Sequence, residues 1–122
     1  MLSLVLLLPA PLAAAPDPSS SQDLTSLRAA VVSGAHRPGD LIAALKTVLA
    51  DHPESAEAHL LLGLAYRLAG PEWLGSAIAE FRQALALDPN LVAGRYFLAQ
   101  AYLDLRRPRR ARGELETALA AK

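Results

Sequence analysis

Residues 62–66 read Leu-Gly-Leu-Ala-Tyr, residues 77–84 read Ala-Ile-Ala-Glu-Phe-Arg-Gln-Ala, and Asp88-Pro89-Asn90 follows them. Part of this pattern returns 36 residues later, where Leu98 and Tyr102 repeat the first leucine and the tyrosine. A period of this length is typical of stacked helical hairpins, because one hairpin cannot bury its apolar face alone. The sequence therefore predicts an all-α fold of antiparallel hairpins stacked as a solenoid, whose usual product is a binding surface.

The rest of the pattern also has copies. The alanines and the phenylalanine of 77–84 are followed 34 residues later by Ala111, Leu115 and Ala118. Upstream, apolar residues and a proline stand 36 residues before the equivalent positions, at Leu41, Leu45, Val48 and Pro53. They predict an earlier, degenerate hairpin with helices near 22–33 and 40–51, in which Asp40 caps the second helix.

The order of leucine-glycine, tyrosine, alanine, phenylalanine, alanine and closing proline resembles the tetratricopeptide repeat. Two details depart from that pattern, because His59 stands where an aromatic residue usually opens it and the turn 70–75 is two residues longer. The resemblance implies a short right-handed solenoid. Its repeat units are expected at 54–90 and 91–122, after the degenerate hairpin at 22–53.

The signature residues are first of all candidates for the core. Gly63 and Ala99 are small where the two helices of a hairpin approach each other. Tyr66, Phe81 and Tyr102 fill the remaining space, and each is worth roughly 1.5–3 kcal/mol when buried. We therefore expect these positions to pack the interior and the function to lie elsewhere.

The N-terminal residues differ in composition from the rest. An apolar run at residues 2–8 is followed by alanines at 13–15, which form an A-x-A-like cleavage site, and the run is too short for about 20 membrane-spanning residues. Residues 1–15 are therefore expected to be a signal peptide that exports the chain to the bacterial periplasm. If they do not act as a signal, the chain stays in the cytoplasm. Residues 16–21, rich in proline and serine, are expected to be a linker.

Composition limits the chemistry that the chain can perform. The 122 residues carry no cysteine and a formal net charge of zero, which excludes disulfides and thiolate metal sites. Three histidines, His36, His52 and His59, are the candidates for a general base or a metal ligand. His36 and His52 lie in predicted turns, and His59 lies on a predicted helix without a partner three or four residues away. We therefore expect no enzyme activity, no cofactor and no metal.

The resemblance implies that the first helix of each hairpin lines a concave face that binds an extended or helical peptide. The positions carried over to this chain are Glu57, Leu60, Leu64, Arg67, Leu68, Tyr96, Gln100, Leu103 and Asp104. Most are apolar, so the expected partner is a hydrophobic or amphipathic segment of another protein. Leu60 and Leu64 replace the lysine and asparagine with which some relatives hold chaperone C-termini, so that partner is a poor fit. The function expected is that of an adaptor or scaffold in the cell envelope.

The C-terminal residues 105–122 carry six basic and two acidic side chains, although the whole chain is neutral. Most of the basic ones gather around one predicted turn, at Arg106, Arg107, Arg109, Arg110 and Arg112. Because arginine binds carboxylates and phosphates in bidentate fashion, this cluster is a candidate site for an acidic partner, with anionic lipid as a weaker alternative. Interleaved aromatic residues are missing, which disfavours nucleic acid. A simple solvated turn is the remaining interpretation.

The last predicted helix has an apolar stripe formed by Leu115, Ala118 and Leu119. Such a stripe faces the place where another hairpin would stack, so it could pair with a second copy of the chain. The alternative function is therefore a small structural subunit that assembles with itself through this helix. Fraying of an alanine-rich end would explain the same residues.

Overall fold

The computed structural model describes residues 21–120 as six α-helices and one short 3₁₀ helix. The elements in order are α1 (Ser21–Ser33), α2 (Pro38–Asp51), α3 (Ala56–Ala69), η2 (Pro71–Trp73), α4 (Leu74–Leu87), α5 (Val92–Asp104) and α6 (Pro108–Ala120). The predicted all-α fold is confirmed, and within this range there is no strand. The signal peptide expected at 1–15 and residues 16–20 of the expected linker lie outside the described residues.

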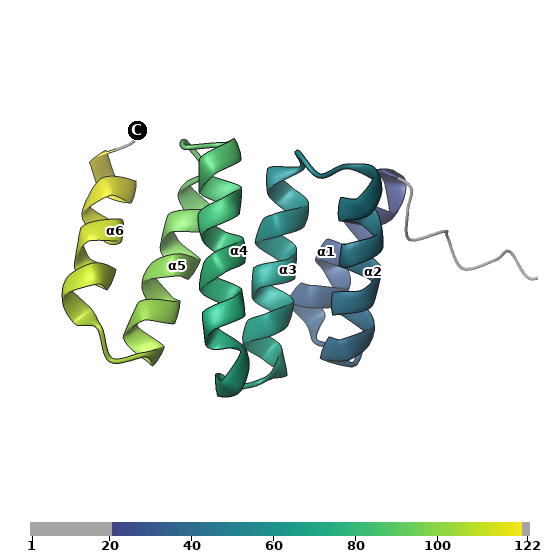
Figure 1. Ribbon diagram of the computed structural model, residues 1–122, viewed down its shortest axis with the longest axis horizontal. Helices are drawn as coiled ribbons and strands as arrows, with labels where there is room; N and C mark the ends of the chain where they lie inside the picture. Colours follow the sequence, from purple (N-terminus) through teal and green to yellow (C-terminus); the bar gives the residue numbers. More distant parts are fainter. Residues whose placement is uncertain (1–20, 121–122) are drawn as a thin grey trace, which may run out of the picture.

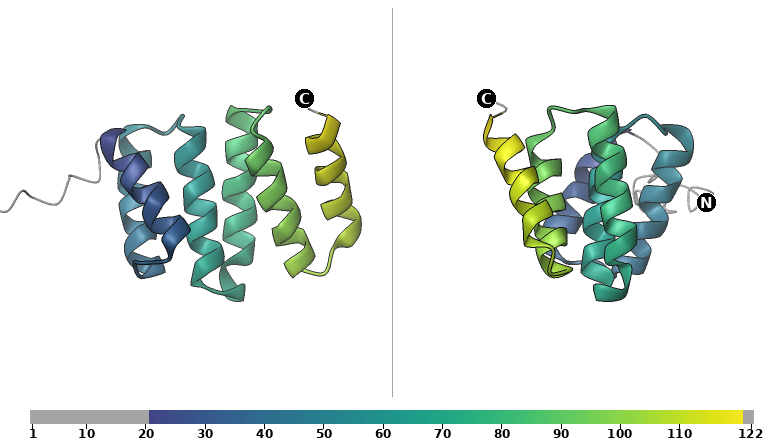
Figure 2. Two further views of the ribbon diagram at one scale, coloured as in Figure 1. Left: turned by 180° about the vertical axis from the view of Figure 1, so that it is seen from behind. Right: turned by 60° about the vertical axis from the view of Figure 1, so that its left-hand side comes forward.

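The helices form a row of antiparallel hairpins (Figure 1). Each helix packs on the next one in the chain, and α3 also contacts both α1 and α5. Seen from behind, α1 lies in front of α2 and α5 lies in front of α4 (Figure 2, left). The first helices of the hairpins therefore line one side of the molecule. No helix within residues 21–120 is both long and apolar enough to cross a membrane.

The core is built from the repeated positions. Phe81, Leu41, Leu45 and Leu98 are the largest fully buried side chains. A Cβ atom on Gly63 would lie 2.5 Å from a ring carbon of Phe81, so this position of α3 has room only for glycine. The expected role of the signature residues in packing is thus confirmed here, and it explains why a glycine stands inside a helix.

The longer turn between α3 and α4 has a structural use. Its residues form η2, and this places the ring of Trp73 over that of Tyr66, with the ring centroids 5.6 Å apart and the planes inclined by 18°. The longer turn therefore places an aromatic ring against the tyrosine of the repeat motif. Such an aromatic pair is worth about 0.5–1.5 kcal/mol beyond its buried area.

The second helix begins earlier than expected. The prediction placed Asp40 as its cap, but α2 starts at Pro38, and Arg37 occupies the cap position without a side-chain hydrogen bond. Proline suits the first helical position because its fixed φ matches the helix and its missing N–H would have no partner there. Asp40 lies instead in the first turn, where a carboxylate interacts favourably with the helix dipole.

Two of the turns use a left-handed residue. At the end of α1, Gly34 has φ +67°, and its N–H donates to the Ala30 carbonyl. At the end of α5, Arg106 has φ +58°, although it carries a side chain. The N–H of Arg106 donates to Leu103 O, and that of Arg107 donates to Tyr102 O, which is the Schellman arrangement.

Candidate binding groove

A groove of about 470 Å³ opens on the side formed by α1, α3 and α5. Its lining consists of Val31, Val32, Leu64, Arg67, Leu68, Phe97 and Asp104. On α3, the lining residues are spaced by three and four positions, so they share one face of that helix. On α5 they are seven positions apart, which returns to the same face after two turns. The helical period therefore directs these side chains into one space.

Most of the groove is apolar. Val32 is 79% exposed and Leu68 is 50% exposed, so both present apolar surface to solvent beside the groove. Phe97 joins the groove to the core, because its ring stacks on Phe81 with centroids 6.2 Å apart. Tyr96 meets Phe97 edge-on at 5.3 Å. The apolar wall is therefore continuous with Phe81, one of the largest fully buried side chains of the core.

The polar side of the groove is a chain of hydrogen bonds between α3 and α5. Arg67 Nε lies 3.2 Å from Asp104 Oδ2, and Arg67 Nη1 donates to Gln100 Oε1 at 2.9 Å. The Gln100 amide then donates to the Tyr96 hydroxyl at 2.8 Å. These contacts hold the two helices at a fixed separation and give the groove one charged end.

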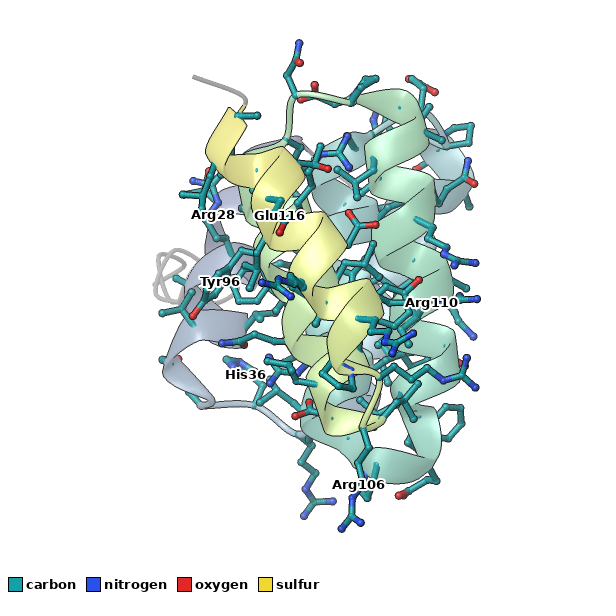
Figure 3. The ribbon with its side chains drawn as sticks, turned by 90° about the vertical axis from the view of Figure 1, so that its left-hand side faces the viewer. Arg28, His36, Tyr96, Arg106, Arg110 and Glu116 are labelled. Atoms are coloured by element: carbon teal, nitrogen blue, oxygen red, sulfur yellow. The ribbon has the colours of Figure 1, made fainter. Side chains whose placement is uncertain are left out.

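A second ion pair ties α1 to α3. Arg28 donates to the Glu57 carboxylate, 29 positions further along the chain. Figure 3 shows Arg28 and Tyr96 on the same side of the molecule, whereas Arg110 lies on the side of α4. The groove is therefore formed by one face of the solenoid and is separate from the arginine cluster.

The residues implied by the resemblance fall into different environments. Leu64, Arg67, Leu68 and Asp104 line the groove. Glu57, Tyr96 and Gln100 take part in the polar contacts beside it, and Leu103 is exposed.

Leu60 was placed wrongly on the exposed face, because only 8% of it is exposed and it belongs to the core cluster. Glu57, which lies three residues before Leu60, forms an ion pair with Arg28 of α1. The first turns of α3 are therefore covered by α1.

Three lining residues were missed by the sequence reasoning. Val31 and Val32 belong to α1, which carries no repeat signature, and only the fold brings that helix against α3. The repeat pattern does not select Phe97, because its neighbour Tyr96 occupies the position expected to be exposed. An aromatic pair at consecutive helical positions is a usable signal, since the two rings point to different faces and one of them must face inward.

The histidines do not converge. His36 and His52 are exposed at helix boundaries, and His59 lies on α3. His59 Nδ1 lies 3.4 Å from the Glu80 carboxylate, and its Nε2 lies 3.0 Å from Pro53 O. Among residues 21–120, no group of three or more histidine, aspartate or glutamate side chains is placed to hold a metal ion.

The arginine cluster and the apolar stripe lie on the last hairpin. Arg106 and Arg107 form the turn before α6, while Arg109, Arg110 and Arg112 lie in its first turns, all of them exposed.

The expected stripe on α6 is uneven. Leu119 is 72% exposed, Leu115 is 37% exposed, and Ala118 is half-buried. The stripe is therefore a small apolar surface at the end of the described helices.

Residues 74–122 match the family model described as "Tetratricopeptide repeat". Among solved structures, the "Crystal structure of MamA" superposes with a TM-score of 0.74 and 25% sequence identity, covering 87% of this chain and 60% of that chain. The "MamA RS-1 ArsTM double mutant" has a TM-score of 0.68 and 22% identity, covering 80% of this chain and 55% of that chain. The present chain therefore spans less than two thirds of either structure. No curated protein matches the sequence.

The fold and the groove define a helical repeat protein whose hairpins stack around a shared core. Residues 74–122 resemble the tetratricopeptide repeat by the family match, and the fold of residues 21–120 is similar to that of the MamA structures.

Proposed function

We propose that this protein is a non-enzymatic adaptor or scaffold that binds an apolar or amphipathic segment of another protein in the groove between α1, α3 and α5. The observation that carries this proposal is the exposed apolar wall of the groove. Val32 and Leu68 face solvent on two helices that are far apart in sequence, and a hollow of about 470 Å³ lies between them. Adjacent exposed apolar side chains around a hollow are a common mark of a protein-binding surface.

The charged end of the groove limits the charge that a bound segment can carry. Arg67 and Asp104 already satisfy each other, so a partner with a single charge would have to break their ion pair. A segment with an apolar face and neutral polar ends would avoid that cost. An amphipathic helix that presents apolar residues at positions i, i+3 and i+4 meets this requirement.

The proposal is tested by affinity capture with the full chain as bait. The groove variant is Val32→Ser with Leu68→Ser. The matched control is Leu87→Ser with Val92→Ser, which removes two other exposed apolar side chains outside the groove lining. A protein captured by the native chain and by the control, but not by the groove variant, would support the proposal. Equal capture by both variants would contradict it.

We also propose that the protein acts in the bacterial cell envelope after export. This rests on the apolar run and the A-x-A-like site within residues 1–15. Replacing two leucines of the run with arginine should retain a C-terminally tagged chain in the cytoplasm, whereas the native chain should fractionate with the periplasm. Identical fractionation of the two would contradict export and favour a cytoplasmic adaptor.

Self-assembly is the second candidate function, favoured by the exposure of Leu119 and Leu115 on α6. If two copies pair through this helix, Leu115→Glu with Leu119→Glu should reduce the mass measured by sedimentation from that of a dimer to that of a monomer. Peptide binding in the groove should survive this change. A native chain that sediments as a monomer at every concentration would exclude this candidate.

A further inference from the structure

The ion pairs of residues 21–120 leave one group of arginines without acidic partners. Four arginines are paired with carboxylates, through Arg28–Glu57, Arg67–Asp104, Arg95–Glu114 and Arg112–Glu116. Five others have no ion pair with a described residue; four of them lie at the turn of the last hairpin and the start of α6, and the fifth lies on α4 beside the same tyrosine as one of the four. We call them the arginine patch: Arg82, Arg106, Arg107, Arg109 and Arg110. Arg37 and Lys46 also lack an ion pair, and they belong to the first hairpin.

The patch differs from the cluster that the sequence indicated. Arg112 is paired with Glu116 one helical turn away, so its charge is already compensated. Arg82 joins instead from α4, because its Nη2 donates to the Tyr102 hydroxyl at 2.7 Å. The guanidinium carbons of Arg82 and Arg110 both lie 5.9 Å from the centroid of the Tyr102 ring. One aromatic ring therefore holds two cations from different helices.

This arrangement concentrates positive charge that no acidic side chain of residues 21–120 neutralises through an ion pair. Like charges that share one ring repel each other, and the attraction of the ring to each cation is small at an exposed site. The first turn of α6 contains no acidic residue, although acidic residues are favoured at the start of a helix. An anion placed among these guanidinium groups would remove the repulsion and make charge-assisted hydrogen bonds.

The surface is also hollowed at this place. A depression of about 410 Å³ is lined by Arg107, Pro108, Arg109 and Arg110. Arginine presents its donors as a planar fork that matches a carboxylate, so a hollow with three such side chains can engage more than one carboxylate at once. The depression therefore provides space for acidic side chains between the guanidinium groups.

We propose that the arginine patch is a second binding site, which takes an acidic segment of a protein partner and is separate from the groove. Figure 3 shows Arg106 extending from the end of the last hairpin and Arg110 on the side toward α4. A flexible acidic chain can follow the turn and contact both directions, whereas a flat bilayer surface meets only one of them. A single-stranded nucleic acid would need an aromatic side chain for stacking, and Tyr102 is buried.

Two surfaces on different sides of one small solenoid would let the protein hold two partners at once. The groove is formed by α1, α3 and α5, while the patch is formed by α4, the turn between α5 and α6, and the start of α6. Substitutions in one surface should therefore leave binding at the other unchanged. The failure of one proposal can thus be distinguished from the failure of the other.

The test uses the full chain and a short fluorescent peptide of alternating glutamate and serine, with binding followed by fluorescence anisotropy. The patch variant is Arg107→Gln with Arg109→Gln, which leaves the contacts to Tyr102 intact. The matched control, Lys46→Gln with Arg112→Gln, removes the same net charge from exposed positions outside the patch. We expect about tenfold weaker binding for the patch variant, as for the loss of two exposed ion pairs, and little change for the control.

Further measurements complete the test. Binding of the native chain should weaken as salt is raised, because exposed charges are screened. The groove variant Val32→Ser with Leu68→Ser should bind the acidic peptide like the native chain. The proposal is overturned if the native chain does not bind the peptide, or if the patch and control variants weaken equally. It is also overturned if the native chain prefers phosphatidylglycerol-rich vesicles or a single-stranded oligonucleotide to the peptide.

Discussion

The hairpins α3–α4 and α5–α6 carry the same motif positions but differ in how well they bury them. Phe81 on α4 is fully buried, whereas Leu115, at the equivalent position of α6, is 37% exposed. The helix α4 packs on both α3 and α5, while α6 packs on α5 within the described residues. Equivalent residues therefore contribute differently, because the burial of a repeat position depends on its neighbours along the stack.

The two hairpins also have equivalent polar contacts at positions that are not part of the repeat motif. His59 reaches the Glu80 carboxylate and the Pro53 carbonyl, with its Nε2 3.0 Å from Pro53 O. At the equivalent positions, Arg95 bonds to Glu114 at 3.2 Å and to the Pro89 carbonyl at 3.1 Å. Both contacts tie the start of a hairpin's first helix to its second helix and to the preceding turn. Different side chains thus perform the same structural role in the two units.

The largest difference between the two hairpins should come from their central side chains. Phe81→Ala is expected to lower the free energy of unfolding by about 3–5 kcal/mol, because it leaves a cavity in the closed part of the core. Leu115→Ala should cost about 1 kcal/mol, since its side chain is already partly in water. Denaturant unfolding of the full chain measures both. Equal losses would show that α6 is covered in solution by something outside the described residues.

The next effect concerns the close approach of the two helices in each hairpin. Gly63→Ala should destabilise the protein by about 1–3 kcal/mol, because the new methyl group meets the Phe81 ring. The double variant Gly63→Ala with Phe81→Leu has the same residue pair as Ala99 and Leu115 in the last hairpin. We therefore expect its loss of unfolding free energy to be smaller than the sum of the losses of the two single variants.

Gly75→Ala is the control for this prediction. A Cβ at Gly75 in α4 would have no neighbour within 4 Å, so that variant should be slightly more stable than the native chain, by about 0.5–1 kcal/mol. If the free-energy changes of Gly63→Ala and Phe81→Leu are strictly additive in the double variant, the two positions are energetically independent, which would contradict the prediction.

A smaller effect is expected at the left-handed turns of the first and last hairpins. Gly34→Ala should cost about 1 kcal/mol, because a Cβ is disfavoured at φ +67°. Arg106→Gly should gain stability by about the same amount at φ +58°. Thermal unfolding of the two variants should shift in opposite directions. If Arg106→Gly also weakens binding of the acidic peptide, Arg106 contributes to binding at the arginine patch although its backbone conformation lowers stability.

The smallest effect should distinguish the two polar contacts. His59→Ala and Arg95→Ala are each expected to cost about 0.5–1 kcal/mol, because a partly buried glutamate loses its partner. His59→Arg, which copies the second unit into the first, should be close to neutral. The comparison is made by chemical denaturation at one pH and salt concentration. A loss after His59→Arg as large as that after His59→Ala would show that the contacts are not interchangeable.

Much of the fold follows from the sequence because helical periodicity and repeat spacing are local properties. The positions of Phe81, Leu41 and Leu45 in the core were predictable from spacing alone. Four of the nine residues assigned to the concave face line the groove, since residues three or four positions apart share a face of a helix.

Other features depend on contacts between residues that are distant in the chain. The burial of Leu60 and the place of Val32 in the groove both require that α1 pack on α3. Arg82 and Arg110 meet at Tyr102 only because the hairpins stack. The sequence by itself determined the helices, the repeat and the apolar positions, because these depend on the chemistry of near neighbours. Only the tertiary structure decided which surfaces stay open and which charges stay unpaired, because each depends on which helices cover it.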